Sequence, residues 1–314
     1  MKYLITGGAG FIGSHLCEEL LKKGSVVCID NFDNYYKKEI KEKNISKILK
    51  SPSFKVYNSC ITDHKKLKEI FEEEKPDKVI HLAAMAGVAL SKEQPFLYDK
   101  VNILGTLNLL ELSKEYNIKK FIFASSSAVY GERKEIPFKE TDQIGHLASQ
   151  YASTKRIGEV LCYHYSTVHE IPSICLRLFG AYGPRGRPDT APQRFTQAIA
   201  NGETITLYGD GDASKDFTYI SDIISGIISA LDRDLTFEII NLGSSEPIEL
   251  KDFISLIEEV VGKKAIIKKL PSLSGDVSKT YADIKKAKEI LDWEPKISLK
   301  EGIAKTHEYY KGFQ

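Results

Sequence analysis

The chain has 314 residues with nearly balanced charges, 44 Lys and Arg against 43 Asp and Glu, which leaves a formal net charge of +1. This balance provides no broad charged surface and argues against nucleic acid or an anionic membrane as a partner. No apolar run approaches the roughly 20 residues needed to cross a bilayer, and the first residues read as a strand with no room for a signal peptide, so we expect a cytoplasmic protein of one large or two closely joined domains.

A glycine-rich turn follows the first predicted strand and precedes an amphipathic helical pattern. Its glycines are Gly7, Gly10 and Gly13, with Phe11 and Ile12 between the last two. Glycines so placed let the chain turn tightly and bring bare backbone to a pyrophosphate, while the helix N-terminus supplies N–H groups and a partial positive charge. The turn predicts a bound dinucleotide. The alternative is a plain tight connection between strand and helix.

The second predicted strand ends at an acidic residue, Asp30, 17 positions after Gly13. This is about where a carboxylate grips the adenosine ribose hydroxyls of a dinucleotide. A carboxylate there repels a 2′-phosphate and therefore predicts NAD rather than NADP. A solvated acid at a strand end is the alternative.

Short β-branched runs alternate with amphipathic helical patterns as far as about residue 180, which is typical of βαβ units. The predicted strands are residues 2–6, 25–30, 54–59, 78–84, 119–126 and 172–178. Six such strands joined by right-handed crossovers predict an α/β fold with a doubly wound parallel (Rossmann) sheet.

The pattern changes after residue 180, where crowded prolines and glycines predict mainly loops. A helix at 221–232 and a strand at 237–241 are predicted to rejoin the first domain. We therefore expect a cofactor domain of residues 1–180, rejoined by about 216–243. A smaller C-terminal α/β substrate lobe would comprise 181–215 and 244–314, with amphipathic segments at 250–261, 283–292 and 299–311.

Tyr151 and Lys155 are four residues apart, which places a phenol and an ammonium on one face of a helix. A nearby cation favours the phenolate and makes Tyr a general base. Three other Tyr/Lys pairs share this spacing, so position must discriminate. Only Tyr151 opens a helix that follows a strand ending in a small polar cluster, 124–131, where ligands of parallel sheets bind. An ordinary helix-surface pair is the alternative.

These motifs together resemble the nucleotide-sugar epimerase and dehydratase family of extended short-chain dehydrogenases/reductases, essentially from end to end. The segments that carry the resemblance are 6–13, Asp30-Asn31, 81–84, Asn102, 125–127, Tyr151 with Lys155, 182–184 and 216–220. The resemblance implies that Ser126 is the catalytic hydroxyl, with Ser127 as the neighbouring candidate. It also implies that Lys155 holds the nicotinamide ribose and that Asn102, Leu82, Ala83 and Ala84 lie near the cofactor, as do Asn31, Cys60 and Ile61.

The residues after Ser126 narrow the reaction that the resemblance implies. Family members that eliminate water carry Asp and Glu there, whereas this chain has Ser127 and Ala128, and decarboxylating members keep a Glu where Ala128 stands. What remains is 4-epimerisation of a UDP-hexose. Tyr151 takes the proton of the 4-hydroxyl, Ser126 relays it, and NAD accepts a hydride and returns it to the other face. A net sugar oxidoreductase and a non-catalytic NAD-binding scaffold are the competing hypotheses.

The segment 182–189 is similar to a loop of UDP-glucuronate 4-epimerases, and Arg187 in it is our candidate for a C6 carboxylate. Alternatively, Arg185 and Arg187 brace the loop or meet the diphosphate. By the resemblance, Tyr208 stacks on the nucleotide base, unless it packs into the core, and Lys215 neutralises phosphate. UDP-glucose, UDP-galactose or their N-acetyl forms are the alternative substrates.

Three positions depart from the family pattern. Relatives have Gly-Asp ahead of an Ile where this chain has Ser59-Cys60, so one adenine contact is missing or left to the backbone. Gly180 stands where the glucuronate-type loop carries Thr, and Ala89 stands where glucuronate epimerases tend to have Arg.

The resemblance also predicts a homodimer that pairs helices at about 95–117 and 148–170, although a face buried against the sheet would show the same apolar excess. The five cysteines are widely spaced and mostly apolar in context. We expect buried free thiols, with neither a disulfide framework nor a metal site.

Overall fold

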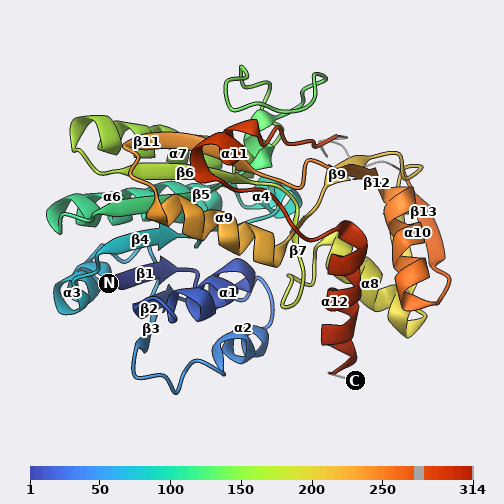
Figure 1. Cartoon of the computed structure of the whole chain (residues 1–314), viewed down its shortest axis with the longest axis horizontal. Coiled ribbons are helices and arrows are strands. Elements are labelled where there is room, and N and C mark those ends of the chain that lie inside the picture. The colour runs from blue at the N-terminus through green and yellow to red at the C-terminus, as the bar shows by residue number, and fades with distance from the viewer. Residues whose placement is uncertain (272–278, 313–314) are drawn as a thin grey trace.

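A seven-stranded parallel sheet forms the centre of the computed structural model, which describes residues 1–271 and 279–312 (Figure 1). The strand order is β3-β2-β1-β4-β5-β6-β11. Their bounds are β1 Lys2–Thr6, β2 Ser25–Asp30, β3 Phe54–Asn58, β4 Lys78–His81, β5 Lys120–Ser126, β6 Ser173–Leu178 and β11 Phe237–Leu242. The strand order reverses between the neighbouring strands β1 and β4. Ligands bind at this switch point in doubly wound folds. The predicted Rossmann architecture is confirmed.

Helices cover both faces of the sheet and enclose two apolar cores (Figure 1). One face is covered by α1 (Phe11–Leu20), α9 (Ile220–Asp232) and α11 (Lys285–Leu291), with α2 (Lys38–Ile45) beside α1. The other is covered by α3 (His64–Glu74), α6 (Gly105–Glu115) and α7 (Gln150–Val168). The segment around α11, predicted for the smaller lobe, packs against β11 and α9 instead.

The smaller lobe is built from helices packed on short strand pairs at the carboxyl edge of the sheet (Figure 1). Its helices are α8 (Ala191–Asn201), α10 (Leu250–Val261) and α12 (Leu299–Lys311). Its strand pairs are β8 (Thr204–Tyr208) with β13 (Ile266–Leu270), β9 (Ser214–Asp216) with β12 (Pro247–Glu249), and β7 (Ala181–Tyr182) with β10 (Thr218–Tyr219).

The expectation of mainly loops after residue 180 is wrong for α8. Pro192 lies in the first turn of this helix, where a missing N–H costs nothing, and Phe195 and Ile199 form its buried face. Proline therefore marks a helix start here rather than a break.

The predicted helical segment near 95–117 has three parts. A short helix α5 (Pro95–Tyr98) continues through a π-helical turn, Asp99–Leu104, into α6. π-Turns inside helices often occur at functional sites, and this one contains the buried Asn102. A six-residue helix α4 (Val88–Glu93) precedes α5. Across residues 1–271 and 279–312, we find no helix that combines the length and the apolar character needed to cross a membrane.

Candidate active site

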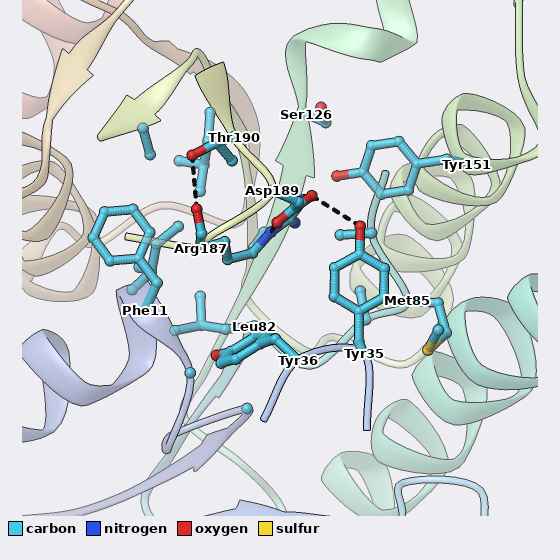
Figure 2. Close-up of a pocket in the computed structure, with 18 of the residues that line it drawn as sticks. Phe11, Tyr35, Tyr36, Leu82, Met85, Ser126, Tyr151, Arg187, Asp189 and Thr190 are labelled. Carbon is cyan, nitrogen blue, oxygen red and sulfur yellow. Dashed lines mark hydrogen bonds and ion pairs between the residues drawn. The ribbon is translucent and has the colours of Figure 1, made fainter. Parts of the chain in front are cut away.

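A cavity of about 850 Å³ opens between the carboxyl ends of the parallel strands and the smaller lobe (Figure 2). Strands β1, β2, β4 and β5 and their following loops form one wall, and residues of β8 and of the 187–195 segment form another. The cavity thus lies at the switch point of the sheet, where the topology predicts a ligand.

The glycine turn forms a cradle without room for side chains. A Cβ on Gly13 would lie 2.1 Å from the carbonyl oxygen of Gly7, and a Cβ on Gly7 would lie 2.8 Å from the backbone nitrogen of Ala83. Gly7 also has a φ of +71°, which favours glycine. Helix α1 begins at Phe11, so its first turn, whose N–H groups lack intrahelical partners, includes Gly13 and lines the cavity. The cradle fits the pyrophosphate of a dinucleotide.

Asp30 ends β2 beside the cradle, with its side chain almost fully buried. Its carboxylate accepts hydrogen bonds from the backbone N–H groups of Ala9 (3.1 Å) and Phe32 (2.8 Å). Burial raises the pKa of Asp30, and these hydrogen bonds oppose the shift. Asp30 therefore joins the glycine turn to the loop after β2, at the position where a ribose would lie.

Tyr151 and Ser126 also line the cavity, with the Tyr151 ring across it from Phe11 (Figure 2). Ser126 ends β5, and its Oγ accepts a hydrogen bond from the backbone N–H of Ala128 (3.2 Å). Ser149 caps the N-terminus of α7 and fixes the start of the helix that carries Tyr151. Burial raises the pKa of the Tyr151 phenol, while the Ser126 hydroxyl and the Arg187 guanidinium lower it.

Lys155 is buried one turn after Tyr151, and its Nζ donates to the carbonyl oxygen of Ala124 (2.7 Å) and lies 5.0 Å from the centre of the Phe123 ring. Burial lowers the pKa of this ammonium to about 8. The groups that lower the pKa of Tyr151 are Ser126 and Arg187. Lowering of that pKa by Lys155 stays a prediction.

A cluster of Arg187, Asp189 and Tyr35 crosses the cavity (Figure 2). Arg187 pairs with Asp189 through two hydrogen bonds, Nε to Oδ1 at 3.0 Å and Nη2 to Oδ2 at 2.6 Å. The Tyr35 hydroxyl donates to Asp189 Oδ2 at 2.9 Å, and its ring lies 5.2 Å from the guanidinium carbon. The loop after β2 is thereby joined to the loop before α8.

Arg185, by contrast, braces its loop. Its Nη2 forms a 2.6 Å ion pair with Glu18 of α1, and its Nη1 donates to Ser14 Oγ at 3.3 Å. Of the two arginines of this loop, only Arg187 lines the cavity.

The structure brings nearly all of the sequence-predicted site residues to this one cavity. Those that line it are Gly7, Gly10, Phe11, Ile12, Gly13, Asp30, Asn31, Cys60, Ile61, Leu82, Ala83, Ala84, Ser126, Ser127, Tyr151, Lys155, Arg187, Tyr208 and Lys215. Tyr208 ends β8 with 38% of its surface exposed, so it does not pack into the core.

Asn102 lies behind the wall rather than in it. Its side-chain amide accepts from the backbone N–H of Met85 (2.8 Å) and donates to the Met85 carbonyl (3.0 Å) and to Thr154 Oγ1 (3.0 Å). It therefore fixes the loop after β4 against α7, next to Lys155.

Gly180 has a structural reason for its departure from the family pattern. A Cβ at this position would lie 2.3 Å from the carbonyl oxygen of Asp216, so a threonine does not fit unless that backbone shifts. Cys60 lines the cavity with its Sγ 3.1 Å from Thr62 Oγ1.

Tyr35, Tyr36 and Asp189 also line the cavity, and the sequence did not predict them as cavity residues. The signal for the two tyrosines was their place directly after β2, because loops at the carboxyl ends of parallel strands bound the ligand site. Asp189 carried no comparable signal, because its contact with Tyr35 spans 154 positions of the chain.

Comparisons with known proteins agree with this geometry. Residues 4–306 match the family model described as GDP-mannose 4,6 dehydratase. A UDP-glucuronate 4-epimerase of Thermodesulfobacterium geofontis is 43% identical over 311 residues, which cover 98% of this chain and 96% of that protein.

Two crystal structures are similar over the whole chain. One is the UDP-glucuronic acid 4-epimerase of Bacillus cereus in complex with UDP-glucuronic acid and NAD, with a TM-score of 0.94, 38% identity and 100% coverage of both chains. The other is a UDP-glucose 4-epimerase of Thermotoga maritima with UDP-glucose, with a TM-score of 0.93, 34% identity and coverage of 100% of this chain and 99% of that one. The chain therefore belongs to the nucleotide-sugar epimerase and dehydratase family of extended short-chain dehydrogenases/reductases.

Proposed function

We propose that this protein is an NAD-dependent 4-epimerase of UDP-hexoses, with UDP-glucuronate and UDP-galacturonate as its preferred pair. The observation that carries the proposal is the placement of Tyr151, Ser126 and Lys155 on one wall of a cavity whose other end is the glycine cradle. Relatives named as UDP-glucuronate 4-epimerases support the choice of reaction.

The cofactor fits the residues present. The glycine cradle would hold its pyrophosphate, Asp30 its adenosine ribose and Lys155 its nicotinamide ribose, and Leu82, Ala83 and Ala84, which line the cavity, would lie along its path. When bound, NAD supplies a hydride acceptor for C4 of the sugar and a donor for its return.

Tyr151 handles the proton in both halves of the reaction. Its phenolate oxygen takes the proton of the sugar 4-hydroxyl. The same oxygen returns a proton after the 4-keto sugar has rotated within the cavity and presents its other face. The Ser126 hydroxyl, which faces this oxygen, holds the sugar oxygen in line and relays the proton. The Lys155 ammonium favours the phenolate as a cation one helical turn away.

Dehydration, the reaction for which the family model is named, lacks its acid and base here. Ser127 and Ala128 follow the catalytic hydroxyl, and neither supplies a carboxyl group for water elimination. Ala128 also stands where decarboxylating members carry a glutamate, so this chain lacks that residue as well. Reversible oxidation at C4 is the chemistry that this wall supports.

The contacts of Arg187 support an acidic sugar as the substrate. Its guanidinium already binds a carboxylate in bidentate fashion, that of Asp189, so a C6 carboxylate can take the same place when it enters the cavity. A neutral hexose is the second candidate, because the Asp189 pairing leaves Arg187 neutralised without a substrate carboxylate.

The test is incubation of the purified protein with UDP-glucuronate, UDP-glucose and UDP-N-acetylglucosamine, with the 4-epimers resolved by NMR. We expect conversion of UDP-glucuronate with no net change in NADH absorbance. Conversion of the neutral sugars alone would reject the role of Arg187. Steady NADH formation would indicate a net oxidoreductase, and no conversion of any sugar would refute the epimerase.

We further propose that the protein forms a homodimer through α5–α6 and α7. The exposed large apolar side chains of these helices are Phe96, Leu104, Ile157, Val160, Tyr163 and Val168. Phe96 is 87% exposed, which is unfavourable for a monomer and typical of an interface. Paired helices from two copies would form a four-helix contact.

We also propose a division of labour along the chain. Residues 1–180 with about 216–243 would hold the cofactor, and residues 181–215 with 244–314 would hold the nucleotide sugar, apart from the segment around α11, which packs against β11 and α9. Tyr208 and Lys215 line the cavity from the second of these parts, which supports this division.

A further inference from the structure

A buried ion pair joins α7, the helix that carries Tyr151 and Lys155, to strand β6. The side chains of Glu159 (α7) and Arg177 (β6) are 0% and 2% exposed. They meet in a bidentate contact, with Arg177 Nε 2.8 Å from Oε1 and Nη2 2.9 Å from Oε2 of Glu159. Apolar residues of similar size often stabilise a core equally well, so such a pair is weak evidence for stability alone. Its neighbours indicate another role.

Glu159 lies on the same face of α7 as the catalytic residues, since Tyr151, Lys155 and Glu159 follow one another at intervals of four. Its Oε1 also accepts a 2.6 Å hydrogen bond from Ser125 Oγ, next to Ser126. Lys155 donates to the carbonyl of Ala124, one residue earlier. Helix α7 is thus fastened to β5 at the two residues that precede the catalytic hydroxyl.

Arg177, the partner of Glu159, connects this contact to the neighbouring strands of the sheet. It is in register with Ser125 on β5 and with Asn241 on β11. Its guanidinium carbon lies 4.6 Å from the centre of the Tyr130 ring, and the Tyr130 hydroxyl donates to Asn241 Oδ1 at 2.7 Å. The partners of Glu159 therefore reach three neighbouring strands.

We propose that the Glu159–Arg177 pair positions the catalytic group by fixing α7 against β5 and β6, so that Tyr151 and Lys155 stay aligned with Ser126 through each turnover. This inference rests on the proposed epimerase function. Glu159 and Arg177 are positioning residues, since they do not line the cavity and act through their contacts with neighbouring residues. Ser125 lines the cavity, and its hydrogen bond to Glu159 carries the positioning effect to β5.

The pair also has an electrostatic effect on Lys155. Burial lowers the pKa of Lys155 to about 8, and Cys162 and the Glu159 carboxylate oppose this shift. The other charged and titratable groups nearby are Tyr151 and Arg156 on α7, His81 on β4, and Arg177 and Cys175 on β6. The partly exposed Arg156 forms a second ion pair with Glu159, with its Nη1 2.8 Å from Oε2. Loss of the Glu159 charge alone would leave Arg177 and Arg156 without this carboxylate partner and lower the pKa of Lys155 further.

Three variants separate alignment from charge. Ser125→Ala breaks the contact with the strand and keeps both charges, so kcat falls about tenfold with KM and the alkaline limb of the pH profile unchanged. Glu159→Gln lowers kcat about a hundredfold and moves the alkaline limb to lower pH by about half a unit or more. Adding Arg177→Met to Glu159→Gln removes both charges of the buried pair and leaves the partly exposed Arg156, so the limb returns toward its wild-type position.

The matched control is Glu74→Gln. The Glu74 side chain is also buried and forms an ion pair with Lys2, and neither residue lines the cavity. We expect it to lower the melting temperature with kcat and the alkaline limb unchanged. Variants at Glu159 and Ser125 that behave like this control would overturn the positioning role. If Glu159→Gln does not fold, Ser125→Ala and the double variant still decide. If the wild type epimerises no UDP-hexose, it is the proposed function that fails.

Discussion

The Tyr151 hydroxyl is the atom on which the proposed chemistry depends. Tyr151→Phe removes this proton acceptor while the ring keeps its edge-on packing against Tyr98, with ring centres 6.4 Å apart. We expect kcat to fall about a thousandfold, since acid–base groups contribute on this scale, with little change in NADH binding measured by fluorescence. Tyr163→Phe, on the exposed side of the same helix, is the matched control and should keep wild-type turnover.

The charge of Lys155 sets the alkaline side of the activity profile. Burial lowers the pKa of Lys155 to about 8, so the ammonium is present below about pH 8 and is lost as the pH rises through that value. In the proposed mechanism this cation favours the Tyr151 phenolate and holds the nicotinamide ribose, so kcat/KM should decline above about pH 8. Initial rates between pH 6 and 10 check this, and a profile that stays flat to pH 10 would contradict it.

Single residues also mark the limit of prediction from sequence. Tyr151, Lys155 and the glycines were predictable because each sits in a local pattern beside a strand end. The pairing of Tyr35 with Asp189 and that of Glu159 with Arg177 were not, because each joins elements that only the fold brings together.

At the scale of elements, the glycine turn and α1 form one unit with almost no free space. Gly13→Ala would place a Cβ 2.1 Å from the Gly7 carbonyl oxygen and force the turn away from α1. We expect a loss of about 2 kcal/mol or more in the free energy of unfolding, measured by urea denaturation, and a loss of NADH affinity.

Gly312→Ala is the control for this change. Gly312 has a φ of −68°, and a Cβ there makes only an ordinary 3.6 Å contact with Tyr309. The control should leave stability within about 0.5 kcal/mol of the wild type. Equal stabilities for the two variants would show that the turn tolerates a side chain.

Elements with a strong period were predicted well, and those shaped by tertiary contacts were not. The β-branched runs of β1, β2, β5 and β6 gave their bounds to within about a residue, because buried parallel strands need continuous apolar sequence. Helix α8 was missed because Pro192 suggested a break. The strand predicted at 78–84 ends at His81, since the next residues leave the sheet to line the cavity.

For the whole molecule, the proposed dimer predicts a response to charge in its apolar face. Val160 of α7 is 52% exposed, so Val160→Glu should fold normally as a monomer but bury a charge in the paired form. Analytical ultracentrifugation should show a dimer for the wild type and a monomer for the variant. Lys22→Glu, on the exposed part of the chain after α1, is the control and should remain dimeric.

In the proposed reaction the hydride that leaves C4 of the sugar returns to C4 without leaving the cavity. The most direct test uses UDP-glucuronate labelled with deuterium at C4, in ordinary water, followed by NMR of the products. We predict UDP-galacturonate with the deuterium retained at C4 and no net NADH. Loss of the deuterium to solvent, or its appearance in free NADH, would contradict the account.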